Sequence, residues 1–178
     1  MRRPLAVFAS ALLVLPMSLA AQSSAPTAPK LDDATIVAIF DAANTADIET
    51  AGLGAQKASD PEIRQIAKNF VHDHTQVRQM ARDLAAKLHV TPTPPANDQS
   101  KADHALTMSK LEHLKGKAFD KAFLDHEIAF HQAVLDAVSS TLLPSIQNEE
   151  LKAFVKSVAP AFQGHLAGAK ALRAKMDA

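Results

Sequence analysis

The sequence predicts an all-α protein, a four-helix bundle, and three observations support this prediction. Apolar residues recur at a three- and four-residue spacing through most of the chain, and no alternating strand pattern persists. Proline or small polar residues interrupt the apolar spacing where helices should end. The chain has no cysteine, so its stability must come from an apolar core or a bound ligand instead of disulfides.

The first residues are typical of an export signal. Arg2 and Arg3 precede the apolar segment LAVFASALLVLPMSLA, which ends in Ser18-Leu19-Ala20, a small-x-small pattern for cleavage. The following AQSSAPTAPK is rich in Ser, Ala and Pro, as flexible leaders are. We therefore expect a signal peptide over residues 1–20, a flexible leader over 21–31 and the bundle domain over 32–176.

Charge and composition narrow the class of protein further. Without Arg2 and Arg3 the chain carries 17 basic and 19 acidic side chains, and it has no tyrosine or tryptophan. No basic stretch suited to phosphates appears, so nucleic acid is not an expected partner. No later segment is apolar enough for stable membrane insertion. We expect a periplasmic protein that could associate with the cell envelope; nothing in the sequence indicates a protein partner.

Each helix can be placed from its boundary signals. Asp32 or Asp33 caps the first, Ser59 or Asp60 with Pro61 starts the second, and the prolines of TPTPPAND end it. Gly116 separates a short helix from the third long one, which Pro144 should end. The expected ranges are about 32–58, 60–90, 98–114, 117–142 and 148–176.

The connections between these helices predict the topology. The first two long helices are joined tightly, as are the last two, so each pair should form an antiparallel hairpin. About 25 residues lie between the hairpins, long for a loop without a role. Two hairpins joined by one long crossover, here with a short helix in it, is the ferritin-like variant of the four-helix bundle.

Polar residues interrupt the apolar face of every long helix. A three-four count places His74 on the seam of the second helix, and His72 about 200° away, facing water. Polar groups at core positions are errors in a plain bundle unless they serve a purpose. Counting from the two turns places all of the seam's polar residues at similar depth: Glu49, His74, Glu127, His131 and His165.

Such a cluster has two chemical interpretations. Three imidazoles and one or two carboxylates could bind one transition metal ion, such as zinc, copper or iron, in a sequestration or envelope stress role. Alternatively, the groups could satisfy one another by hydrogen bonds in a structural or interaction protein, where the polar layer only fixes helix register. No nucleophile–base pair or phosphate-binding loop appears, so no enzymatic activity is predicted.

Four segments resemble one bacterial family. AKNFVHDH, DIETAGLGAQKASDPEIR, GKAFDKAFLDHEIAFHQAVLDA and VAPAFQGHLAGAK, in their order along the chain, look like the family called domain of unknown function 4142. The resemblance spans about Asp32 to Leu172 and implies a ferritin-like helical fold. It also implies recurrent polar positions at Glu49, Asp73-His74, His131 and the segment 160–165. Family members often carry glutamine where this chain has Glu127.

The metal count follows from a motif that is absent. Di-iron bundles use Glu-x-x-His on two helices. Here the residues three positions before His74 and His165 are Val71 and Phe162. If a metal binds, we therefore expect a single ion with mainly nitrogen ligands.

Overall fold

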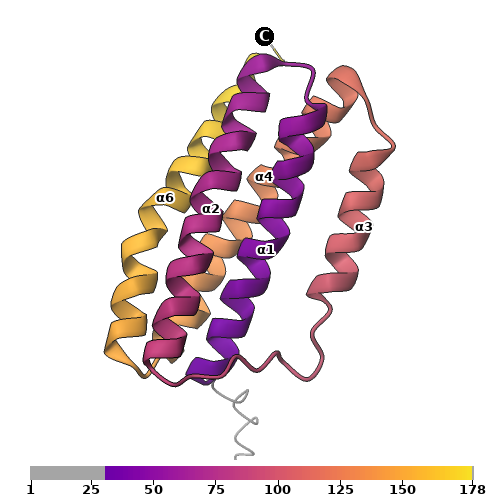
Figure 1. Ribbon diagram of the computed structural model, residues 1–178. Coiled ribbons are helices and arrows are strands. Elements are labelled where there is room, and N and C mark those ends of the chain that lie inside the picture. The colour runs from indigo at the N-terminus through magenta and orange to yellow at the C-terminus, as the bar shows by residue number, and fades with distance from the viewer. Residues whose placement is uncertain (1–30, 178) are drawn as a thin grey trace, which may run out of the picture.

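The structure, a computed structural model, describes residues 31–177, and in this part of the chain it contains helices and no strands. Figure 1 shows four long helices packed side by side. They are α1 (Asp33–Lys57), α2 (Pro61–Lys87), α4 (Gly116–Ala137) and α6 (Glu149–Lys175). The short helix α3 (Ser100–Glu112) lies outside them, alongside α1.

The topology agrees with the sequence prediction. α1 and α2 form one antiparallel hairpin, α4 and α6 form the other, and the crossover between them carries α3 (Figure 1). This is the ferritin-like arrangement. The signal peptide predicted over 1–20 and all but the last residue of the predicted leader lie outside the described residues. Leu31, that last residue, packs against the core. None of the helices over residues 31–177 is long and apolar enough to cross a membrane.

Side-chain caps place the helix starts where the sequence predicted them. The Asp32 carboxylate accepts a hydrogen bond from the backbone N–H of Thr35 at 2.7 Å. Asp60 accepts from the N–H of Glu62 at 2.7 Å, with Pro61 at the first helical position. Asn148 caps α6 in the same way. Each side chain satisfies N–H groups that a helix start leaves without a partner.

The third long helix differs from its prediction near Pro144. We expected one helix to about residue 142; instead α4 ends at Ala137 and continues into a π-helical turn, η1 (Val138–Leu142), and the short α5 (Leu143–Ser145). Proline has no N–H, and its ring clashes with the carbonyl four residues earlier in a regular helix. The wider π turn accommodates this clash, so the helical path ends after Pro144 instead of before it.

Buried or turn-facing carboxylates hold both ends of the bundle together. Asp120 of α4 is buried and accepts hydrogen bonds from the N–H groups of Ser59 and Asp60, at 2.8 and 3.0 Å, in the α1–α2 turn. At the other end, Asp33 of α1 accepts from the N–H groups of Gln147 and Asn148. The two hairpins are therefore fixed relative to each other along the bundle axis.

A polar layer separates two apolar clusters in the core. One cluster includes Phe40, Val77 and Val155, and the other includes Ala67, Phe123 and Ala169. Between them along the helices come buried groups that are not apolar: Asn44, Asp47, His74, Glu127, His131 and His165.

Candidate metal centre

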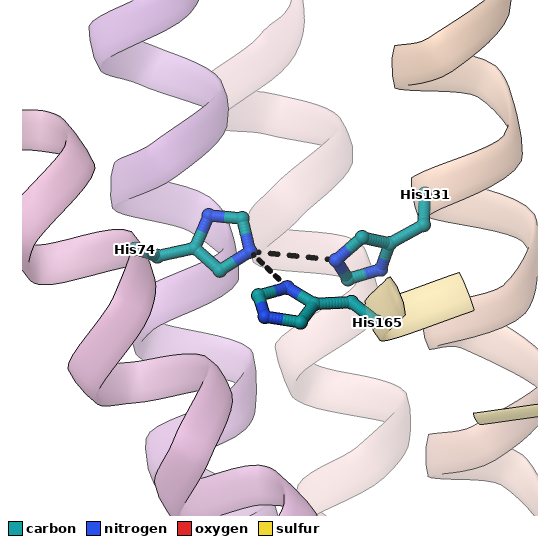
Figure 2. Close-up of side chains that lie close together, drawn as sticks. All are labelled: His74, His131 and His165. Carbon is teal, nitrogen blue, oxygen red and sulfur yellow. Dashed lines mark hydrogen bonds between the residues drawn. The ribbon is translucent and has the colours of Figure 1, made fainter. Parts of the chain in front are cut away.

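Three buried histidines from three helices converge in this layer. His74 comes from α2, His131 from α4 and His165 from α6. His74 Nε2 lies 3.4 Å from His131 Nε2 and 3.1 Å from His165 Nδ1 (Figure 2). The structure therefore brings together the three histidines that the sequence placed at one depth.

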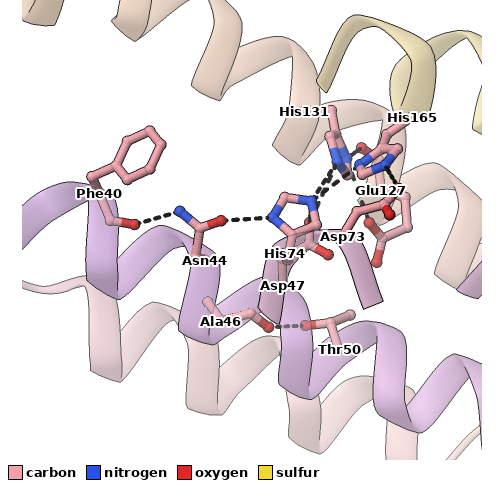
Figure 3. Close-up of polar contacts among 10 residues, drawn as sticks. All are labelled: Phe40, Asn44, Ala46, Asp47, Thr50, Asp73, His74, Glu127, His131 and His165. Atoms are coloured by element: carbon pink, nitrogen blue, oxygen red, sulfur yellow. Dashed lines mark hydrogen bonds and ion pairs between the residues drawn. The ribbon is translucent and has the colours of Figure 1, made fainter. Parts of the chain in front are cut away.

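The outward nitrogen of His74 is held by Asn44 of α1. Asn44 Nδ2 donates to the Phe40 carbonyl at 2.8 Å, so the Asn44 amide oxygen faces the histidine (Figure 3). That oxygen lies 2.9 Å from His74 Nδ1 and can only accept a hydrogen bond. The proton of the neutral ring is therefore on Nδ1, and Nε2 directs a lone pair toward the other two histidines.

The same logic assigns the other two rings. His131 Nδ1 lies 2.9 Å from the Glu127 backbone carbonyl, and His165 Nε2 lies 3.0 Å from a carboxylate oxygen of Asp73. Both partners accept only, so both outward nitrogens carry the proton. The inward nitrogens, His131 Nε2 and His165 Nδ1, are left with lone pairs. Histidine held by an acceptor on its outer N–H is the usual arrangement of a metal ligand.

Burial keeps these rings neutral. Loss of hydration lowers the pKa of His74 to about 2, with further lowering from the two neighbouring histidines. The pKa of His131 is lowered to about 4 and that of His165 is also lowered, burial being the largest cause in both. Three neutral rings with lone pairs 3.1 to 3.4 Å apart have no proton to share between them. A cation at their centre would satisfy all three.

Asp47 of α1 supplies a fourth donor, which the sequence analysis missed. Its Oδ2 lies 3.6 Å from His74 Nε2 and 3.5 Å from His131 Nε2. Four ligands placed tetrahedrally about 2.1 Å from an ion are about 3.4 Å from one another. The donor separations in this layer match that edge length, so three imidazoles and Asp47 fit a tetrahedral ion.

The carboxylates of the layer have no other partner. Among the described residues, the buried side-chain atoms without a hydrogen bond are the four carboxylate oxygens of Asp47 and Glu127. Burial raises the pKa of Asp47 to about 8. It also raises the pKa of Glu127 well above its ordinary value, and the nearby Asp47 raises it further. Buried carboxylates without donors require a proton or a cation nearby.

Glu49 does not join the cluster, contrary to the prediction that it lies on the core seam. Its side chain is 55% exposed, and its Oε2 lies 2.7 Å from His104 Nε2 of α3. The predicted stripe of α1, from Ile39 through Ala46 to Glu49, is turned toward α3 and is only half-buried where it is apolar. The buried stripe is a neighbouring one: Val37, Phe40, Asn44, Asp47, Ala51 and Gly54.

A recognisable signal for Asp47 was present in the sequence. Asp47 is spaced by three and seven residues from Asn44 and Phe40, on one helix face. The two polar members made this stripe look less apolar than its neighbour. His72, in contrast, is exposed as predicted.

The fold and this site define the molecule as a helical-bundle protein with a buried cluster of imidazoles and carboxylates. The chain belongs to the family described as Domain of unknown function (DUF4142), whose model matches residues 18–172. This confirms the resemblance found in the sequence.

Solved structures with the same fold belong to proteins of low sequence identity. The chain is similar to "CopM in the Cu(II)-bound form", at 17% identity and a TM-score of 0.62, covering 82% of this chain and 98% of that one. It is also similar to a DUF305 fragment from Deinococcus radiodurans, at 12% identity and a TM-score of 0.69, covering 80% and 95%. No curated protein matches the chain significantly.

Proposed function

We propose that this chain is an exported bundle protein that binds one transition metal ion, in metal sequestration or envelope stress tolerance. The ligands are His74, His131 and His165, with Asp47 as the fourth. The observation that carries the proposal is the convergence of three imidazole lone pairs whose outward nitrogens are each held by an acceptor. Four protein donors close the coordination sphere, which favours storage over catalysis.

Copper is the favoured ion among zinc, copper and iron. Imidazole nitrogen suits all three, and the cluster offers nitrogen and oxygen donors without sulfur. A structural neighbour has been solved in a Cu(II)-bound form, which supports copper for a bundle of this shape. The expected signal peptide over residues 1–20 places the protein in the periplasm or at the cell envelope.

Ion binding and its effect on stability test this proposal. Purified protein should bind one Cu(II) or Zn(II) ion per chain, and saturation at 100 times Kd should stabilise the fold by about 2.7 kcal/mol. For a chain of this size, the melting temperature should rise by roughly 5–10 °C. His74→Ala, His131→Ala and His165→Ala should each abolish this rise. His72→Ala, an exposed histidine two residues from His74, is the matched control and should keep it.

The structural alternative gives the opposite result. If the layer only fixes helix register, copper and zinc will leave the melting temperature unchanged. His74→Leu combined with His165→Leu will then leave the stability equal to that of the wild type or raise it. A wild-type chain that binds neither ion at neutral pH contradicts the proposal.

A further inference from the structure

Glu127 is a buried carboxylate that the four-donor site does not use. It comes from α4, its exposure is 0%, and neither of its side-chain oxygens has a hydrogen-bond donor. Its Oε2 lies 3.5 Å from His131 Nδ1, but that N–H donates to the Glu127 backbone carbonyl instead. A group held so deeply without a partner calls for an explanation beyond packing.

The contacts of Glu127 place it beside the ion position. Its carboxylate, the Asp47 carboxylate and one His131 nitrogen lie within 4.8 Å of one another. The nitrogen nearest to it, His131 Nδ1, is the one that points away from the other histidines. Glu127 therefore reaches the ion through its charge and not as one of the four donors.

The charges of the layer select the charge of the ion. Among the described residues, the layer holds two carboxylates and three histidines, and its ion pairs include no lysine or arginine. A divalent ion with both carboxylates ionised makes the interior neutral. A monovalent ion leaves one negative charge uncompensated, which is unfavourable far from water.

We infer that Glu127 is the specificity-determining residue of this centre, selecting divalent ions such as Cu(II) and Zn(II) over monovalent Cu(I) and Ag(I). The inference rests on the proposed metal site and names the class of ion that the site takes. Donor chemistry acts in the same direction, because the soft monovalent ions favour thiolate and thioether ligands and this cluster has neither.

Glu127→Gln tests the inference, since it keeps the shape of the side chain and removes its charge. Affinities for Cu(II) and Zn(II), and anaerobically for Cu(I) and Ag(I), are measured by chelator competition at one pH. The variant should lose at least tenfold in affinity for the divalent ions, with little change for the monovalent ions. Glu49→Gln, the same change at the exposed glutamate of α1, should alter neither.

The outcomes separate this inference from the proposed function. An equal loss for both classes of ion would show that Glu127 only positions His131, and would overturn the inference. The wild type alone provides a second test, which does not depend on the variant folding: it should bind Zn(II) at least tenfold more tightly than Ag(I). Equal affinities overturn the selectivity but leave the metal site standing. Wild-type protein that binds no ion at all overturns the proposed function itself.

Discussion

At the scale of single residues, Asn44 decides which nitrogen of His74 faces the centre. The Asn44 amide is itself held by the Phe40 carbonyl, so it presents its oxygen, not its nitrogen, to the ring. This chain of two hydrogen bonds fixes the tautomer that a metal ligand needs. Such outer partners are worth as much to a site as some of its ligands.

Replacing Asn44 should weaken metal binding without removing a ligand. We expect Asn44→Ala to reduce Zn(II) affinity by about 10- to 100-fold, because the ring loses its fixed tautomer and orientation. Chelator competition measures the change. Asn69→Ala, at an exposed asparagine of α2 whose side chain contacts only Gln65, is the control. Unchanged affinity in Asn44→Ala would mean that Asn44 has a packing role only.

The buried groups give the stability of the metal-free protein opposing pH dependences. His74 and His131 titrate at about 2 and about 4 when folded, against 6.5 ordinarily, so acid favours the unfolded chain below about pH 6.5. Asp47 titrates at about 8 when folded, against 3.8 ordinarily. The stability from its bound proton is complete below about pH 4 and is lost as the pH rises through 8.

Metal affinity should follow Asp47 across the neutral range. The ion must displace the proton that the folded chain holds on this carboxyl, so affinity should fall about tenfold per pH unit below pH 8. Zn(II) titrations of the wild type at pH 6, 7 and 8 measure this slope. Asp47→Asn should bind more weakly and lose most of the slope. A wild-type affinity that does not change from pH 6 to 8 would contradict the role of Asp47 as a ligand.

At the scale of elements, α1 and α4 approach closely where α1 carries a glycine. A Cβ on Gly54 would lie 2.5 Å from the tip of the Phe123 ring, which is fully buried and stacked on Phe119. A Cβ on Gly52, two residues earlier, would meet nothing within 4 Å. The AGLGA segment is therefore a packing feature in which one glycine is required.

Alanine at these two glycines should change stability in opposite directions. Gly54→Ala should destabilise the fold by about 1–3 kcal/mol, because the core cannot accept an added methyl group beside Phe123. Gly52→Ala should stabilise it by up to about 1 kcal/mol through helix propensity alone. Urea unfolding measures both free energies. Equal effects of the two substitutions would show that α1 and α4 are packed less closely than described.

At the scale of the whole molecule, the polar layer divides an otherwise apolar core. It places two carboxylates without donors between two apolar clusters. Such groups weaken a metal-free fold, and their value appears only when a cation occupies the layer.

Replacing both carboxylates should exchange metal binding for stability. Asp47→Leu combined with Glu127→Met should raise the unfolding free energy of the metal-free protein by about 1–4 kcal/mol, because apolar groups of similar size fill the layer. The same variant should lose the thermal shift with Cu(II) or Zn(II). Urea unfolding with a chelator present, then with the metal, checks both parts. A variant less stable than the metal-free wild type would contradict this account of the layer.

The sequence alone determined the helices, their hairpin topology and the depth of four of the five predicted site residues. This was achievable because caps, prolines and apolar spacing are local signals, and His74, Glu127, His131 and His165 each interrupt a clear apolar stripe. Even the π turn before Pro144 lies where a break was expected.

The face of α1 was decided only by the tertiary structure. α1 has apolar or small residues on several sides because α2, α4 and α3 all pack around it, so its periodicity could not distinguish the bundle's interior from the side covered by α3. Packing excluded Glu49 from the core and placed Asn44 and Asp47 in it. The tautomers were decided there too, because a proton's position on an imidazole depends on acceptors contributed by other helices, or by an earlier turn of the same one.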